Sequence, residues 1–229
     1  MLKVSNYTVA YGESEVVHEV GFTAGQGEIV AVMGRNGMGK TTLFKSLIGV
    51  LPLKSGRVEV DGADVSKDES YRRVAKGIGY VPQGRMIFPT LTVEENIETG
   101  LENVKEKIIP EDIYALFPVL FEMRKRKGGN LSGGQQQQLA IARALVTNPK
   151  VLLLDEPTEG IQPSIIKDIG RVIRMLADRK TMAIVLVEQY YDFAAELADQ
   201  YLVMERGEIV ARGRGADMEA EGVRQKMSI

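Results

Sequence analysis

The stretch that decides the fold is Gly34-Arg35-Asn36-Gly37-Met38-Gly39-Lys40-Thr41-Thr42. Residues 34–41 match the pattern G-x-x-x-x-G-K-[ST], whose glycines let backbone N–H groups curl around phosphate oxygens. The apolar run Gly27–Met33 precedes this stretch, and a helical pattern over Lys40–Leu51 follows it. A strand, a glycine-rich loop and a helix in this order predict an anion site at the helix N-terminus, where the helix dipole favours phosphate.

The lysine and the threonines of this stretch supply its side-chain chemistry. Lys40 is predicted to reach the β- and γ-phosphates of a nucleotide. The Thr41 hydroxyl is predicted to bind Mg²⁺, with Thr42 behind it. The alternative is a glycine-rich turn before an ordinary helix, and the apolar run before the loop argues against it. We therefore expect the residues from Gly34 to Thr42 to contact a bound nucleotide.

A second apolar run, Val151–Leu154, ends in two carboxylates, Asp155 and Glu156. An acidic residue at the end of a buried strand suits Mg²⁺ coordination, directly or through water, so Asp155 is predicted to bind the metal. Glu156 is predicted to orient or deprotonate an attacking water. Paired acids at a strand end are often only a solvated edge. The phosphate loop in the same chain makes a catalytic site the better interpretation.

A third motif, Leu131-Ser132-Gly133-Gly134-Gln135, comes just before the helical run Gln136–Leu145. It predicts another helix N-terminus with free N–H donors, and so a second anion site that has no lysine of its own. Two such sites far apart in one chain suggest that a second subunit completes each of them. Taken in isolation, the motif is better explained as a simple capped helix start.

The rest of the chain indicates one α/β domain over residues 1–229. Strands alternate with helices, which predicts a mostly parallel sheet covered on both faces, preceded by an antiparallel β portion at the N-terminus. Apolar spacing turns helical over residues 91–146, which are expected to form a helical lobe inserted between core segments 1–90 and 147–229. Each nucleotide-site motif occurs once, so the chain is expected to be one nucleotide-binding unit.

Composition excludes several classes of protein. The formal net charge is −2 with no strongly basic block, so no nucleic-acid partner is expected. Cysteine is absent, which excludes disulfides and thiolate metal sites and fits a cytosolic location. The N-terminus lacks the pattern of a signal peptide. Apolar runs such as Met182–Val187 are far shorter than the roughly 20 residues that cross a bilayer, so a role at a membrane requires a partner.

The phosphate loop, the motif 131–135 and the carboxylates Asp155 and Glu156, in this order, resemble the ABC ATPase family over essentially the whole chain. The resemblance implies a P-loop, RecA-like core and a pair of subunits that sandwich ATP, each ATP held by the loop of one chain and the signature motif of the other. It also implies that Tyr11 stacks on adenine and that Gln83 touches Mg²⁺. An ordinary turn or core tyrosine and a surface-loop glutamine are the alternatives for these two positions.

Two positions depart from the usual family pattern. Gln189 stands where the family usually has a histidine near the γ-phosphate, and glutamine can donate a hydrogen bond but cannot carry a proton. Gln162 stands where the family often has aspartate. Both changes resemble the branch of importers for branched-chain amino acids and amides, and segments 157–164 and 186–193 look most similar to the ATP-binding subunits of urea importers. The one histidine, His18, is expected to be a surface or packing residue.

The resemblance implies an ATPase that powers a membrane importer, most similar to those for urea, with branched-chain amino acid import as the alternative. ATP and Mg²⁺ are the implied cofactors. The implied partners are membrane-spanning permease subunits, a second and related ATPase chain in preference to a second copy, and a substrate-binding protein. The implied location is the cytoplasmic face of the plasma membrane. An ABC ATPase without a transport role, a catalytically weak binding module and an exporter subunit remain as alternatives.

Overall fold

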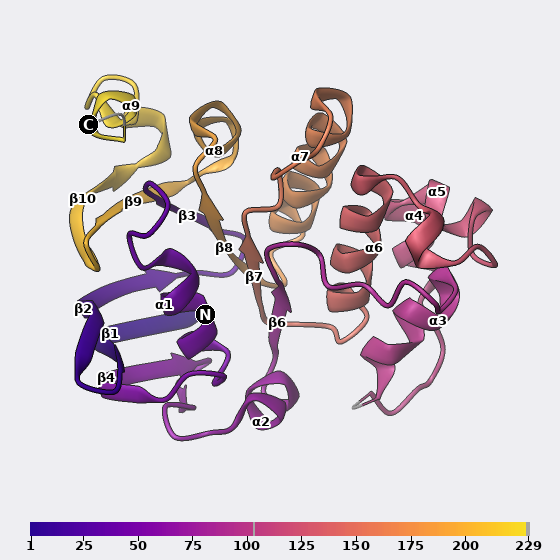
Figure 1. The fold of residues 1–229 in the computed structure, drawn as a ribbon, viewed down its shortest axis with the longest axis horizontal. Coiled ribbons are helices and arrows are strands. Elements are labelled where there is room, and N and C mark those ends of the chain that lie inside the picture. The colour runs from indigo at the N-terminus through magenta and orange to yellow at the C-terminus, as the bar shows by residue number, and fades with distance from the viewer. Residues whose placement is uncertain (103, 228–229) are drawn as a thin grey trace.

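The computed structural model describes residues 1–102 and 104–227, and within them it contains two β-sheets (Figure 1). The antiparallel sheet lies at the N-terminus, and its strand order is β2-β1-β4-β5. It includes the long hairpin of β1 and β2, which turns at Gly12. The strands of this sheet are β1 Leu2–Tyr11, β2 Ser14–Ala24, β4 Leu53–Val60 and β5 Ala63–Asp64.

The second sheet has the order β10-β9-β3-β8-β7-β6, and its pairs are parallel except for β10 with β9. Strands β3, β7 and β8 are buried along their whole length, as expected for short apolar runs in a sheet covered on both faces. The strands of this sheet are β3 Ile29–Met33, β6 Ile78–Val81, β7 Val151–Asp155, β8 Ala183–Glu188, β9 Gln200–Glu205 and β10 Glu208–Arg214.

Helices cover both faces of this sheet and also form a group on one side of the molecule (Figure 1). That group lies within residues 91–146 and comprises α3 Val93–Glu98, η1 Thr99–Leu101, α4 Glu111–Leu116, α5 Pro118–Glu122, η2 Gly128–Asn130 and α6 Gly133–Leu145. No helix among the described residues is long and apolar enough to span a bilayer. The remaining helices are α1 Lys40–Leu47, α2 Ser70–Ala75, α7 Pro163–Asp178, α8 Tyr191–Leu197, η3 Gly215–Asp217 and α9 Val223–Lys226.

Apolar side chains form a core on each face of the six-stranded sheet. One cluster lies between the two sheets and includes Leu43, Phe44 and Leu47 of α1. A second cluster continues from the opposite face into α6, α7 and the helices of residues 91–122. A third, smaller cluster joins β3 and β9 to α8 and α9. The helices of residues 91–146 therefore share a core with the sheet. The division of the chain into a core and an inserted lobe stays a prediction.

Most predicted elements form within a few residues of their expected bounds. The helix predicted over 40–51 instead ends at Leu47, because Gly49 turns the chain with a φ of 78° and Arg73 donates to the carbonyls of Ser46 and Leu47. Helix α2 and strand β5 were not predicted, because both are too short to show a repeating apolar pattern.

Candidate nucleotide-binding site

The phosphate loop joins β3 to α1, and its glycines have conformations that other residues rarely adopt. Gly37 and Gly39 have φ values of 79° and 97°. A Cβ atom on Gly39 would also lie 3.0 Å from the carbonyl oxygen of Val16 in β2. These positions need glycine because of both the backbone turn and the close approach of another chain segment. The loop thus has the shape that the motif predicts.

Lys40 lies at the centre of the site and is only 3% exposed. Its Nζ donates to the carbonyl oxygens of Gly34 and Arg35, at 2.8 Å each, and lies 3.5 Å from Oε1 of Glu156. Burial lowers the pKa of Lys40, and the carboxylate of Glu156 opposes that shift. The cation is therefore held against the inside of the loop, where it can meet a phosphate.

Asp155 ends β7 and is completely buried. Its Oδ1 accepts from the Thr41 hydroxyl at 3.3 Å, and its Oδ2 accepts from the Tyr80 hydroxyl of β6 at 3.1 Å. Burial raises the pKa of Asp155 to about 6, with the nearby Glu156 carboxylate adding to the shift and the hydrogen bond from Tyr80 opposing it. Thr41 and Asp155, which are both predicted to bind Mg²⁺, are thus hydrogen-bonded to each other.

Glu156 is the residue on which the other polar side chains converge. Its Oε1 accepts from Nε2 of Gln189 at 2.8 Å, and its Oε2 accepts from Nε2 of Gln83 at 3.3 Å. Its backbone has a φ of 48°, which is unusual for a residue with a long side chain. Its N–H donates to the carbonyl of Val187 in β8 at 2.9 Å, so the strained turn is anchored to the neighbouring strand.

Sheet topology explains why residues so far apart in the sequence meet here. Strands β3, β8 and β7 are parallel neighbours, in which Met33 lies beside Glu188 and Val187 beside Asp155. Their carboxyl ends therefore lie at one edge of the sheet. The segments that follow these strands are the phosphate loop, the turn at Glu156 and the segment that contains Gln189.

Gln189 lies between the phosphate loop and Glu156. Its Nε2 donates to Oδ1 of Asn36 at 2.7 Å as well as to Glu156. A cavity of about 720 Å³ opens beside it, lined by the loop and by the start of α8, with Arg224 and Met227 at its border. The glutamine thus occupies a position from which its amide can reach a group bound in the loop.

The donor atoms suit Mg²⁺ held jointly with a nucleotide. Thr41 and Asp155 present a hydroxyl and a carboxylate oxygen, the hard ligands that Mg²⁺ prefers. Within residues 1–102 and 104–227, no cluster of three or more His, Cys, Asp or Glu side chains could hold a metal alone. Phosphate oxygens and water would have to complete the coordination. Gln83 contacts Glu156 and Glu159, so its predicted role at the metal stays a prediction.

The motif 131–135 forms the start of α6, and helix α6 lies well away from α1 (Figure 1). Ser132 caps the helix by accepting from the N–H of Gln135, whose side chain in turn accepts from the N–H of Ser132. Gly134 packs against α7, where a Cβ atom would lie 2.7 Å from Cγ2 of Ile165. This glycine therefore has a packing role that the sequence analysis did not recognise.

The other predicted positions are placed as follows. Tyr11 ends β1 and is 48% exposed, so its ring is accessible, and its contact with adenine stays a prediction. His18 lies on β2, where its side chain is paired with Glu15 at 3.3 Å. It is thus a partly exposed side chain paired with a surface carboxylate, as the sequence predicts.

Sequence reasoning missed three residues of this site, namely Tyr80, Thr158 and Glu188. Glu188 is buried at the end of β8, and its carboxylate binds Thr158. An acidic residue directly after an apolar strand was the signal that found Asp155, and the same signal marks Glu188. Nothing in the sequence reveals that the Tyr80 hydroxyl reaches Asp155, because that contact depends on the pairing of β6 with β7.

Comparison with protein families matches residues 17–159 to the family described as ABC transporter. The chain is 40% identical over 217 residues to the high-affinity branched-chain amino acid transport ATP-binding protein BraG of Pseudomonas aeruginosa, covering 93% of this chain and 91% of that protein. It is 33% identical over 218 residues to the lipopolysaccharide export system ATP-binding protein LptB of Escherichia coli, covering 93% and 90% of the two chains.

Solved structures of ATP-binding cassettes share the fold. A nucleotide-free cassette from an ABC transporter superposes with a TM-score of 0.85 at 28% identity, covering 100% of this chain and 97% of that one. A dimeric cassette in a post-hydrolysis state with ADP and phosphate gives a TM-score of 0.83 at 26% identity, covering 93% and 98%. The predicted fold, an α/β cassette with an antiparallel sheet and helical parts, is confirmed.

Proposed function

This chain belongs to the ABC transporter family of ATP-binding subunits, and we propose from that premise that it powers import of branched-chain amino acids. Like the other ATP-binding subunits of the family, it is an ATPase that works as a dimer with membrane permease subunits. The 40% identity to BraG carries the proposed substrate. The convergence of Lys40, Asp155, Glu156 and Gln189 at one sheet edge carries the proposed ATPase mechanism.

In the proposed mechanism, the phosphate loop binds the nucleotide and Lys40 neutralises its β- and γ-phosphates. Lys40 would exchange the loop carbonyls for phosphate oxygens, which are better partners for a cation. Thr41 and Asp155 would hold Mg²⁺, with Gln83 near it, and the metal would supply charge neutralisation at the phosphates. Tyr11 would stack on the adenine ring.

Glu156 would act as the general base for the attacking water. Its carboxylate lies between the amides of Gln83 and Gln189, which hold it in one orientation. Gln189 also contacts the loop through Asn36, so it would position the γ-phosphate relative to the base. Glu156→Gln should therefore bind ATP normally and hydrolyse it about 100- to 10,000-fold more slowly, since only the base is removed.

The signature motif would serve the ATP of the opposite subunit. Within one chain the motif at 131–135 starts α6, which is separate from the loop that starts α1 (Figure 1). The resemblance to importers favours a related ATPase chain as the opposite subunit, and a substrate-binding protein as a further member of the complex. The assembly would place this chain on the cytoplasmic face of the plasma membrane.

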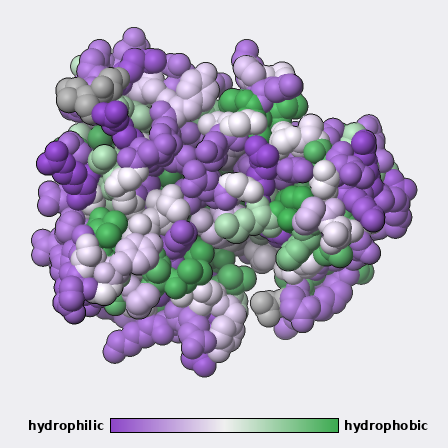
Figure 2. All heavy atoms as spheres, in the orientation of Figure 1, coloured by the Kyte–Doolittle hydropathy of each residue, from purple (hydrophilic) through white to green (hydrophobic). Residues whose placement is uncertain are grey.

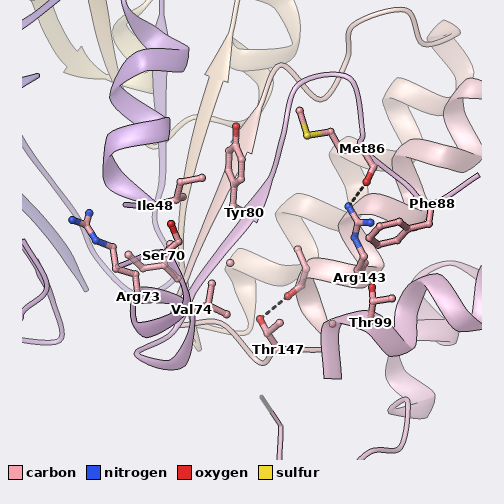
Figure 3. A pocket seen from close by; sticks show the side chains of 14 residues that line it. Ile48, Ser70, Arg73, Val74, Tyr80, Met86, Phe88, Thr99, Arg143 and Thr147 are labelled. Carbon is pink, nitrogen blue, oxygen red and sulfur yellow. Dashed lines mark hydrogen bonds between the residues drawn. The ribbon is translucent and has the colours of Figure 1, made fainter. Parts of the chain in front are cut away.

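A groove of about 430 Å³ is the proposed docking site for a segment of the permease (Figure 3). It lies between α2 and β6 on one side and the segment 86–88, η1 and α6 on the other. Apolar side chains gather around this hollowed part of the surface (Figure 2). Its labelled lining residues include Ile48, Val74, Tyr80, Met86, Phe88 and Arg143.

This groove connects the permease to the ATP site. The Tyr80 side chain lines the groove (Figure 3). Its hydroxyl donates to Asp155. Gln83, three residues before the groove residue Met86, donates to Glu156. Arg143 of α6 holds the wall formed by residues 86–88 in place by donating to the carbonyl of Met86 at 2.8 Å. A permease segment that moved the walls of this groove would therefore act on Asp155 through Tyr80 and on Glu156 through Gln83.

Urea is the second candidate substrate. It rests on segments 157–164 and 186–193, including Gln189, which resemble the ATP-binding subunits of urea importers. The name of the relative that is 40% identical supports branched-chain amino acids instead. The site residues are proposed to bind ATP and not the transported molecule, so they do not distinguish between the two substrates. That choice would be made by the permease and the substrate-binding protein.

Uptake of labelled leucine and labelled urea by cells that lack this chain tests the proposal. We expect leucine uptake to be lost, restored by the intact chain and not by Lys40→Ala. Loss of urea uptake alone would identify urea as the substrate and would leave the proposed ATPase mechanism unchanged. Loss of neither would favour export, as in the lipopolysaccharide system of the relative LptB, or a role outside transport.

A further inference from the structure

The carboxyl group of Glu188 is buried behind the site described above, with 2% of the residue exposed. Its Oε1 accepts from the backbone N–H of Thr158 at 3.1 Å and from the Thr158 hydroxyl at 2.8 Å. Its Oε2 accepts from the backbone N–H groups of Gln189 at 3.1 Å and Tyr190 at 3.2 Å. Each oxygen of this carboxylate thus holds a different segment of the chain.

Both of these segments are connected to Glu156: the first is part of its turn, and the second carries a side chain that contacts it. Thr158 belongs to the turn that begins at Glu156, whose backbone is strained. Gln189 donates from its side chain to both Glu156 and Asn36. Glu188 therefore fixes the distance between the turn that presents the base and the backbone that presents Gln189.

The hydrogen bonds to Glu188 favour the charged form of its side chain. Three of the partners are backbone N–H groups, which can only donate, and the fourth is the Thr158 hydroxyl, so a carboxylate can accept from all four. Burial raises the pKa of Glu188, while the hydrogen bonds from Thr158, Tyr190 and Gln189 oppose that shift. Burying a carboxyl group has an energetic cost, and here four hydrogen bonds offset it.

We propose that Glu188 is a positioning residue for ATP hydrolysis, which clamps the Glu156 turn to the Gln189 segment so that base and amide meet the γ-phosphate together. The proposal rests on the role of Glu156 proposed above. Glu188 is not among the groups that hydrogen-bond Lys40 or Thr41, and its charge is the last of the influences that raise the pKa of Lys40, after Glu156 and Asp155. Its removal should therefore change the chemical step and leave nucleotide binding nearly intact.

Glu188→Gln opens this clamp whichever way the new amide turns. An amide has one oxygen that accepts and one nitrogen that cannot, so either Thr158 or the pair of N–H groups at 189 and 190 would face the NH₂ group. The shape and volume of the side chain stay the same. The loss of hydrogen bonds is thus separated from any loss of packing.

The experiment measures ATP turnover with Mg²⁺ and ATP affinity for the full chain, alone and assembled with its permease subunits. Glu188→Gln should lower kcat about 10- to 100-fold, because misplacement of catalytic groups by about 1 Å can have effects of this size. KM and the Kd for ATP should stay within about threefold of the intact chain, since the phosphate loop is unchanged.

Asp199→Asn is the matched structural control. Asp199 also holds a backbone group through its carboxylate, accepting from the N–H of Ile29 at 2.8 Å, but it does so at the start of β3. Both variants should lower the Tm by a few degrees, and only Glu188→Gln should lower kcat. Thr158→Ser, which keeps the hydroxyl and the N–H, should retain more of kcat than Thr158→Val.

Two results would overturn the proposal: a kcat for Glu188→Gln within twofold of the intact chain, or an equal loss of kcat in Asp199→Asn. If Glu188→Gln does not fold, the comparison of Thr158→Val with Thr158→Ser decides, and equal kcat values for these two would overturn it. Glu156→Gln is assayed in parallel. Full turnover by that variant would contradict the role of Glu156 itself, and with it that of Glu188.

Discussion

At the scale of single residues, the site combines buried carboxylates with a buried lysine. Asp155 is completely buried and adjoins Glu156, so desolvation and a like charge both oppose its ionisation. The Tyr80 and Thr41 hydroxyls donate to it and hold it in place. In the chain without nucleotide, a proton on Asp155 therefore stabilises the fold.

The first prediction concerns the pH dependence of stability that Asp155 causes. Because its pKa rises from 3.8 to about 6 on folding, the native state binds the proton more tightly than the unfolded chain does. The free energy of unfolding should thus fall as pH rises from about 4 to about 6, by an amount on the order of 3 kcal/mol from this group. Above that window its contribution should be constant.

Asp155→Asn isolates this contribution. The variant should be more stable than the intact chain at pH 7 to 8, and the difference should vanish near pH 4. Chemical denaturation of both proteins in EDTA and without nucleotide, at several pH values, measures it. A difference in stability that stays constant across the pH range would contradict the assignment.

At the scale of elements, the crossing of α6 and α7 depends on one glycine. Gly134 is buried in the first turn of α6, and the Cβ of an alanine there would lie 2.7 Å from Cγ2 of Ile165. Ile165 is β-branched, so its side chain cannot easily rotate away. The neighbouring Gly133 faces the guanidinium of Arg85, the far end of a flexible side chain, at 3.2 Å.

The second prediction is that Gly134→Ala lowers the free energy of unfolding by about 1–3 kcal/mol, because overpacking at the helix crossing outweighs the gain in helix propensity. Gly133→Ala is the matched control and should change it by less than about 1 kcal/mol. Urea denaturation of the two variants gives the comparison.

A double variant tests whether the contact with Ile165 is the cause. Gly134→Ala combined with Ile165→Ala should destabilise the chain by less than the sum of the single effects, since the second change removes the clash. If the two effects are additive, the loss of stability in Gly134→Ala does not come from the contact with Ile165.

At the scale of the whole molecule, the apolar groove lies where two groups of elements meet. Met86 and Phe88 form one wall and are 67% and 47% exposed, although both are large and apolar. Asn96 holds this wall in place, accepting from the N–H of Phe88 and donating to its carbonyl. An exposed apolar surface on a firmly held segment is typical of a protein interface.

The third prediction is that Met86→Glu and Phe88→Glu reduce co-purification with the permease subunits about tenfold or more, because a charge would be buried in the groove on assembly. ATP affinity of the isolated chain should not change. Met175→Glu is the control, since Met175 is 49% exposed on α7 outside the groove. Equal loss of assembly in all three variants would contradict the groove as the docking site.

Much of this protein follows from the sequence by itself. The phosphate loop, the apolar runs of β3, β7 and β8, and the two acids at the end of β7 are local patterns. Each is determined by residues that are close in the chain. Glycines in the loop are required by backbone conformation, and buried parallel strands are required by the length and apolarity of each run. For these reasons the fold and the ATPase activity could be predicted correctly.

Only the tertiary structure decided which distant side chains meet. The hydrogen bond from Tyr80 to Asp155, the clamp of Glu188 on Thr158 and the contact of Gly134 with Ile165 each join elements whose pairing no local pattern contains. The order β3-β8-β7-β6 of the sheet brings the carboxyl ends of its parallel strands together. The site is therefore completed by strand order and helix packing, which depend on the burial of apolar surface over the whole chain.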